Sequence, residues 1–202
     1  SDRVHLDAQW PDLRTRCTVW VSPEDDIELR QIELRNTSSQ AISLELLSVF
    51  EVCLAQARAD ETHPAFGNLF VQADWDATDR ALYLSRRPRL GTEEGLHAVH
   101  FIAHADAHLT VVRVQSDRAR WMGRHRDAAH PLAHVDSILA PSGDCVTGLD
   151  PVAALSMQLT LPAHGSAQLT LGTAAAASRA ALETLVDRYH QHALIERSSL
   201  MS

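Results

Sequence analysis

Lysine is absent from this 202-residue sequence, so all eighteen basic side chains are arginine. Schiff-base chemistry needs a lysine amine, which excludes pyridoxal-phosphate enzymes and lysine-dependent aldolases. Glutamate is missing between Glu94 and Glu183, which leaves few carboxylates for acid–base catalysis in the middle of the chain. There is also no G-x-S-x-G, Walker A, G-x-G-x-x-G or H-E-x-x-H motif, so common hydrolase, nucleotide-binding and zinc-protease signatures are lacking.

Cysteines are few: Cys17, Cys53 and Cys145 are widely spaced and form no C-x-x-C pair. This spacing predicts neither a disulfide framework nor a zinc cage, and it favours a reducing compartment such as the cytoplasm. No apolar run approaches the ~20 residues that cross a bilayer, and no secretion signal opens the sequence, so we expect no direct membrane contact. The formal net charge of −8 argues against nucleic-acid binding.

Alternating apolar residues recur from Thr18 to about Leu171, a pattern typical of an antiparallel all-β domain. In residues 27–35 the apolar positions change phase, which predicts a β-bulge near Arg30 and Gln31. Residues 47–55 form a nearly unbroken apolar run, which predicts a strand buried on both faces and a buried, unreactive Cys53. The pattern therefore favours two packed layers of strands.

The period changes near the end of the chain. Ser178 is a suitable N-cap, and apolar residues then recur every three or four positions, which predicts one amphipathic helix from Arg179 to about Ile195. We accordingly divide the chain into a β domain, residues 1–177, and a C-terminal helix with a tail, residues 178–202. The apolar stripe of this helix could cover the β domain or a helical domain elsewhere in a longer protein.

A cluster of arginines around Trp121 is the strongest candidate binding site, because its local charge opposes that of the whole chain. Arginine forks suit carboxylates, phosphates and sugar hydroxyls, and the tryptophan ring offers a face for a pyranose. Alternatively, these arginines pair with Asp117 and Asp127, and Trp121 fills the core. A second basic group, which is either a binding surface or a solvated rim, comprises Arg80, Arg86, Arg87 and Arg89.

Histidines at positions 97, 100, 104 and 108 have spacings that suit a metal site on a helix. However, their surroundings alternate as a strand, which places His100 and His104 on one face and His97 on the other. We therefore expect no metal site and no cofactor.

Six short segments together resemble one family. In order, they are VSPEDDIELR (21–30), ELRN (33–36), HPAF with LFV (63–66, 69–71), RRPR (86–89), SDR through WMGR (116–118, 121–124) and LDPV (149–152). They are similar to the β-supersandwich domain that precedes the helical barrel in cyclic β-(1→2)-glucan synthases and in the related cellobiose-type phosphorylases of glycoside hydrolase family 94. The resemblance runs from about Val19 to Tyr189, with Gln115 where an acidic residue is expected and Trp121 where Phe is expected.

This resemblance implies a galactose mutarotase-like, two-layer antiparallel β-supersandwich with a carbohydrate-binding role. In the family, an aspartate of the helical barrel is the general acid and phosphate is the nucleophile, and that barrel is absent from this sequence. The parent protein of the synthase type is an inner-membrane protein whose domains of this kind face the cytoplasm. The helix from Arg179 would then lead into the barrel.

The sequence thus favours a non-catalytic carbohydrate-binding or scaffolding domain whose partners are a β-glucan or oligosaccharide and the barrel, with a homodimer left open. The residues expected at a glucan are Trp121, Arg118, Arg124 and Arg87, and no catalytic residue is assigned. The alternative is a free-standing aldose 1-epimerase on the same fold. Such enzymes place a glutamate base on a late strand, where this chain has none.

Overall fold

The computed structural model describes residues 2–62, 64–88, 95–109, 111–127 and 143–202. Its strands are β1 (Val4–Gln9), β2 (Leu13–Val21), β3 (Ile27–Asn36), β4 (Ile42–Glu51), β5 (Val71–Asp76), β6 (Ala81–Arg86), β7 (His97–Ala105), β8 (Val111–Asp117), β9 (Gly143–Cys145), β10 (Pro151–Leu161) and β11 (Ser166–Ala176). Its helices are α1 (Ala57–Thr62), α2 (Pro64–Asn68), α3 (Arg118–Met122), α4 (Arg179–Tyr189) and α5 (His192–Met201).

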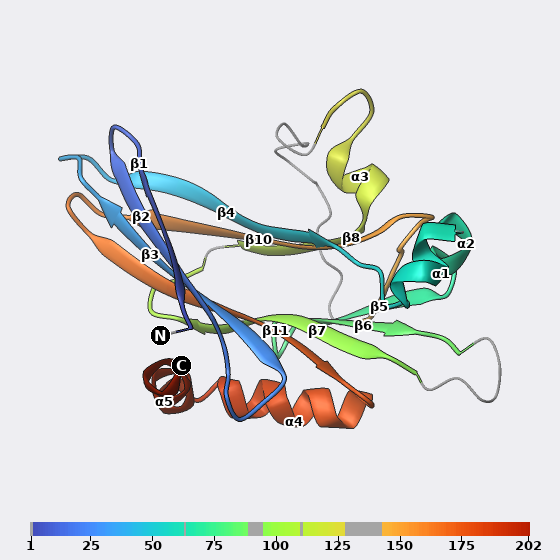
Figure 1. Cartoon of the computed structure of the whole chain (residues 1–202). Helices are drawn as coiled ribbons and strands as arrows, with labels where there is room; N and C mark the ends of the chain where they lie inside the picture. Colours follow the sequence, from blue (N-terminus) through green and yellow to red (C-terminus); the bar gives the residue numbers. More distant parts are fainter. Residues whose placement is uncertain (1, 63, 89–94, 110, 128–142) are drawn as a thin grey trace.

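The strands form two stacked antiparallel sheets. The large sheet has the order β1-β2-β3-β11-β7-β6-β5-β9, and the small sheet has the order β4-β10-β8. Figure 1 shows the small sheet lying over the large one, with α4 and α5 on the opposite side of the large sheet. The predicted two-layer antiparallel architecture is therefore confirmed, and the helices add a third layer.

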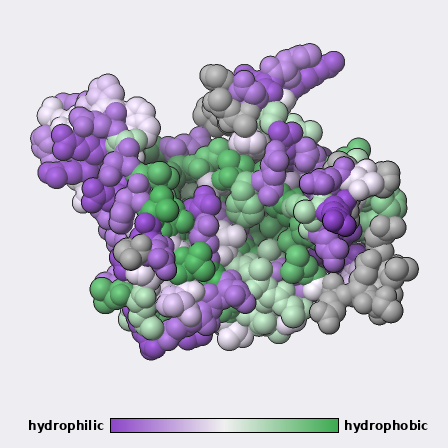
Figure 2. All heavy atoms as spheres, in the orientation of Figure 1, coloured by the Kyte–Doolittle hydropathy of each residue, from purple (hydrophilic) through white to green (hydrophobic). Residues whose placement is uncertain are grey.

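The space between the sheets is filled by the inward side of β10, the central strand of the small sheet. Its alternate residues from Ala153 to Leu161 are at most 1% exposed, and they pack against Leu169 and Leu171 of the large sheet. β4, an edge strand of the small sheet, contributes partly buried apolar residues to the same core. In Figure 2 apolar side chains accordingly gather in a band between the two sheets.

The phase change in β3 has a different cause from the predicted bulge. β3 pairs with both β2 and β11 in unbroken register, so its backbone is regular. Ile27 and Leu29 point toward α4 and α5, whereas Leu34 points toward the small sheet. The strand buries one face over its first half and the other face over its second half, because a different layer covers each half.

The C-terminal segment forms two helices rather than the single predicted one. The side chain of Ser178 accepts a hydrogen bond from the Ala181 amide, as expected for the N-cap of α4, and α4 ends at Tyr189. Its apolar stripe is buried against Trp20 and Phe101 of the large sheet. In α5, Ser198 accepts a hydrogen bond of 3.1 Å from the Trp20 indole. The β domain itself therefore covers the stripe.

Two further sequence expectations are wrong. β4 ends at Glu51, before the apolar run of residues 47–55 is complete, and the chain leaves the sheet there, so Cys53 is exposed rather than buried. In addition, β7 contains an extra residue, since Thr170 pairs with His104 and Leu171 with Ile102. This irregularity turns His104 toward His192 of α5, at 4.3 Å between ring centroids, away from the side that His100 occupies.

Candidate functional site

The arginine-rich segment begins at a helix that is capped by its own sequence. The Asp117 carboxylate accepts hydrogen bonds from the amides of Ala119, at 2.9 Å, and Arg120, at 3.3 Å, which is the standard N-cap arrangement for α3. The side-chain oxygen of Gln115 accepts from the amides of Ser116 and Asp117, each at 3.0 Å. The neutral Gln115 thus shapes the turn from β8 into α3.

A glycine on the neighbouring loop makes room for this cap. Gly148 has a φ of +61°, and a Cβ at this position would lie 2.8 Å from the carboxylate of Asp117. Any larger residue would displace the capping carboxylate, so the loop before β10 and the start of α3 fit together only with glycine here.

Arg118 connects α3 to two other segments. Its guanidinium lies 2.9 Å from a Glu51 carboxylate oxygen and 3.2 Å from one of Asp150, and its amide donates to the Asp150 carbonyl at 3.0 Å. The Arg118 side chain is one-third exposed, so each ion pair contributes modestly. These contacts fix the position of α3 and occupy donors that a sugar would otherwise use.

Trp121 packs inward. Its side chain lies on the outer face of the small sheet with Val152, Ala154 and Val49, and the residue is 5% exposed. Its indole nitrogen is buried and has no hydrogen-bond partner among the described residues. A pyranose cannot stack on a ring that is covered in this way, so in this conformation Trp121 holds α3 against the sheet.

The other two predicted contacts lie in different parts of the fold. Arg124 is exposed in the turn after α3, whereas Arg87 is exposed just past β6 in the large sheet, where its amide donates to the Phe70 carbonyl at 2.9 Å. Arg118, Trp121 and Arg124 are therefore close in sequence and structure, and Arg87 belongs to the other layer. Arg89 and His63 lie outside the described residues. A role of these side chains at a sugar stays a prediction.

Exposed apolar side chains gather at one end of the domain, a feature that the sequence reasoning missed. Backbone and side-chain contacts tie their segments together: Asn68 donates to the Leu149 carbonyl, Ser116 to the Val146 carbonyl, and the Arg86 amide to the Leu96 carbonyl. We call this group the apolar end; it comprises Phe66, Leu69, Leu96, Val146 and Leu149, each 42–66% exposed. The sequence signal that could have revealed this group is the presence of large apolar residues next to turn-forming residues.

His97, His100 and His104 do not converge, and within the described ranges no three His, Cys, Asp or Glu side chains come together as metal ligands. His100 lies between the sheets, with its Nε2 2.9 Å from the Ser48 hydroxyl of β4. Burial lowers the pKa of His100 to about 4, so the ring is neutral at physiological pH. Among the helices described, none combines the length and the apolar character needed to cross a membrane.

Comparison with known proteins identifies the class to which this supersandwich belongs. The chain is a member of the family of glycosyl hydrolase 94 supersandwich domains, whose model matches residues 1–192. A relative is the cyclic beta-(1,2)-glucan synthase NdvB of Rhizobium meliloti (strain 1021), which is 26% identical over 178 residues. The match covers 88% of this chain and 6% of the length of NdvB, so the chain corresponds to a small part of that protein.

Among solved structures, the chain resembles a provisionally assigned aldose 1-epimerase from Klebsiella pneumoniae, with a TM-score of 0.37 and 10% sequence identity. The superposition covers 94% of this chain and 53% of the other.

Proposed function

We propose that this chain is a carbohydrate-binding and scaffolding domain, without catalysis of its own, of a longer protein of the cyclic β-(1→2)-glucan synthase type. The match to the supersandwich family over residues 1–192 carries this proposal, together with the relative NdvB. In the family that the sequence resembles, the general acid belongs to a helical barrel. On this view, the domain holds glucan near a catalytic centre that another domain supplies.

The carboxylates around α3 support the non-catalytic part of the proposal. Asp117 caps the helix, and Glu51 and Asp150 are held by Arg118. A glycosidase needs two carboxylates free to act as acid and base across the scissile bond. Here the nearby acids have structural roles.

For the sugar contact we propose the surface beside α3, with Arg124 as an exposed donor, Arg118 as a partly available donor and Arg87 as a separate contact at the end of β6. Trp121 supports this surface from below. Forked arginine donors match pairs of adjacent sugar hydroxyls without requiring a charged ligand.

We further propose that the apolar end packs against the helical barrel of the parent protein. Its five large side chains are exposed and lie on segments that hydrogen bonds hold together, and gathered apolar residues of this kind mark interaction surfaces. The cysteines of the described structure are all free thiols, which agrees with a domain on the cytoplasmic side of an inner membrane.

The proposal is tested by titrating the chain with β-(1→2)-linked oligoglucosides while recording amide NMR spectra. We expect shifts beside α3, weakened by Arg124→Ala and unchanged by Arg16→Ala, an exposed control on β2. Lone modules bind such ligands weakly, so millimolar sugar is required. Absence of shifts at that concentration would refute the binding role.

Polarimetry of freshly dissolved glucose gives the second readout. Anomer exchange that is faster with the protein than in buffer alone would refute the non-catalytic assignment.

A further inference from the structure

The outer face of the large sheet carries a second group of polar side chains, which the residues discussed above do not include. β9, β5, β6 and β7 are neighbours, and their registers place polar residues opposite one another in two rows. The first row is Asp144, Asp74 and Tyr83; the second is Gln72, Ser85 and His97. Tyr83 also packs against Leu182 of α4, so both rows lie on the side that faces the helices.

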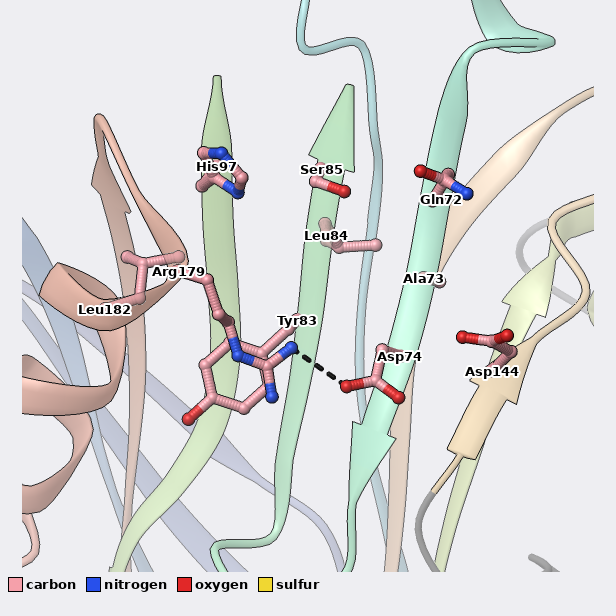
Figure 3. Close-up of a pocket in the computed structure, with 10 residues that line it drawn as sticks. All are labelled: Gln72, Ala73, Asp74, Tyr83, Leu84, Ser85, His97, Asp144, Arg179 and Leu182. Atoms are coloured by element: carbon pink, nitrogen blue, oxygen red, sulfur yellow. Dashed lines mark hydrogen bonds and ion pairs between the residues drawn. The ribbon is translucent and has the colours of Figure 1, made fainter. Parts of the chain in front are cut away.

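A cavity of about 210 Å³ lies over these rows, and the start of α4 forms one wall of it through Arg179 and Leu182. Figure 3 shows Arg179 reaching from the helix over Tyr83 toward Asp74, while His97, Ser85 and Gln72 line the other end. The volume is below the ~300–1,000 Å³ that is usual for drug-sized ligands, so the cavity has room for one small molecule.

The arginine at this wall is held rigidly. Its guanidinium carbon lies 3.3 Å from the centre of the Tyr83 ring, its Nη1 donates to Asp74 at 2.9 Å, and its Nε donates to Glu183 at 2.8 Å. Because these contacts fix the plane of the guanidinium, the Nη2 hydrogens of Arg179 are presented in one orientation. The hydroxyl group of Tyr83 is buried, and within the part of the chain that the structure describes it has no hydrogen-bond partner.

The two carboxylates of the first row face each other across the β5–β9 pair. Asp74 and Asp144 are direct register partners, and like charges in this position repel. Arg179 neutralises Asp74, but Asp144 forms no ion pair within the described part of the chain. An arrangement of this kind is stabilised by a ligand that donates hydrogen bonds to both carboxylates.

The chemistry of the cavity narrows the ligand class. The negative charge of Asp144 beside the Arg179–Asp74 pair disfavours phosphate and other anions, and the mixture of polar and apolar lining residues suits a ligand that has both kinds of surface. A calcium ion takes six to eight oxygen ligands, whereas one of the two carboxylates is already committed to Arg179. Sugar hydroxyls both donate and accept, and the cavity offers acceptors on Asp74 and Asp144 and donors on Arg179 and Gln72.

We propose that this cavity binds a single neutral sugar residue, with vicinal hydroxyls donating to Asp144 and Asp74 and accepting from Arg179. That the sugar is a glucose unit of the glucan rests on the proposed function. The cavity lies on the outer face of the large sheet, and α3 lies on the outer face of the small sheet. The two surfaces therefore bind independently.

The test uses the whole 202-residue chain and two probes, methyl β-glucoside and the β-(1→2)-linked disaccharide sophorose, followed by amide NMR shifts. We expect shifts at Asp74, Ser85 and Asp144 with either probe. Asp144→Ala removes an ionised acceptor and should raise Kd about tenfold. Gln72→Ala, which also changes an exposed side chain, should weaken binding to a smaller extent, and Asp187→Ala, an exposed acid of α4 outside the cavity, is the matched control.

Each contrary result has a definite meaning. Shifts confined to residues beside α3 would overturn the cavity site and leave the proposed function intact, whereas cavity shifts alone would support the site and count against the α3 surface. Equal affinity in Asp144→Ala and in the unmodified chain would overturn the assignment of Asp144. Calcium chloride that shifts the same amides more strongly than either sugar would show a cation site instead, and no shift with any sugar would refute both proposals.

Discussion

Acidification should destabilise the protein through His100, which joins the two sheets. Its Nδ1 lies 3.2 Å from the Gly172 carbonyl and 2.9 Å from the Thr173 hydroxyl, and its Nε2 lies 2.9 Å from the Ser48 hydroxyl. A carbonyl can only accept, so Nδ1 carries the proton and Nε2 accepts from Ser48 in the neutral ring. Protonation would force a charge into the core and remove that acceptor.

The direction and the size of this change in stability follow from the shift in the pKa of His100. Burial lowers the pKa of His100 from 6.5 to about 4, so the unfolded state binds the proton more tightly than the folded state. The stabilising effect is complete above pH 6.5 and is lost as the pH falls toward 4. Between neutral pH and pH ~5, the free energy of unfolding should fall by about 2 kcal/mol on account of this residue.

Urea denaturation followed by tryptophan fluorescence, at a series of pH values from neutral to about 5, measures this loss. His100→Gln lacks the titrating ring and is less stable overall. Between neutral pH and pH ~5, its free energy of unfolding should fall by about 2 kcal/mol less than that of the unmodified chain. His108→Gln changes an exposed histidine and should keep the full dependence. Parallel pH profiles for the unmodified chain and His100→Gln would refute the reasoning.

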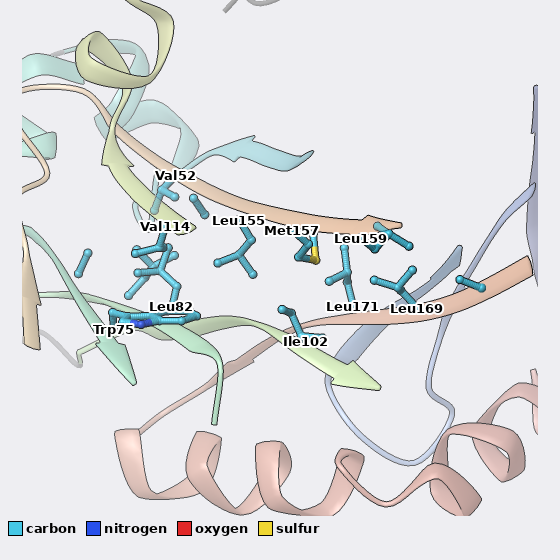
Figure 4. Close-up of a cluster of buried hydrophobic side chains, with 14 of the residues drawn as sticks. Val52, Trp75, Leu82, Ile102, Val114, Leu155, Met157, Leu159, Leu169 and Leu171 are labelled. Carbon is cyan, nitrogen blue, oxygen red and sulfur yellow. The ribbon is translucent and has the colours of Figure 1, made fainter. Parts of the chain in front are cut away.

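Three further predictions concern the core, the thiols and the helix cap. Leu155 lies deep between the sheets in Figure 4, so Leu155→Ala should lower the free energy of unfolding in urea by about 2–5 kcal/mol. Leu47 is 39% exposed, so Leu47→Ala should lower it by less than about 1 kcal/mol. Similar losses in the two variants would contradict the packing. A maleimide should label exposed Cys53 before partly buried Cys17, and the reverse order would count against the end of β4 at Glu51. Asp117→Ala should lower the free energy of unfolding by about 1 kcal/mol and speed amide hydrogen exchange in α3, because the helix loses its N-cap. Unchanged stability and exchange would contradict a stabilising role of this cap.

The periodicity of the sequence predicted the antiparallel sandwich, the Ser178 cap and a helical C-terminus, because alternation and capping depend on residues close in the chain. The motifs between residues 21 and 152 also indicated the family, which the match over residues 1–192 shows. Local signals of this kind are largely independent of what packs on the segment. They account for the class of fold and for the identity of the family.

Tertiary structure decided which side of each element is covered. The phase change in β3 came from α4 and α5 covering one half and the small sheet the other, and Trp121 is buried because α3 folds onto the small sheet. The opposition of Asp74 and Asp144 depends on the register between β5 and β9, almost seventy residues apart. Neither period nor composition encodes such pairings, because contacts between distant segments determine burial and register.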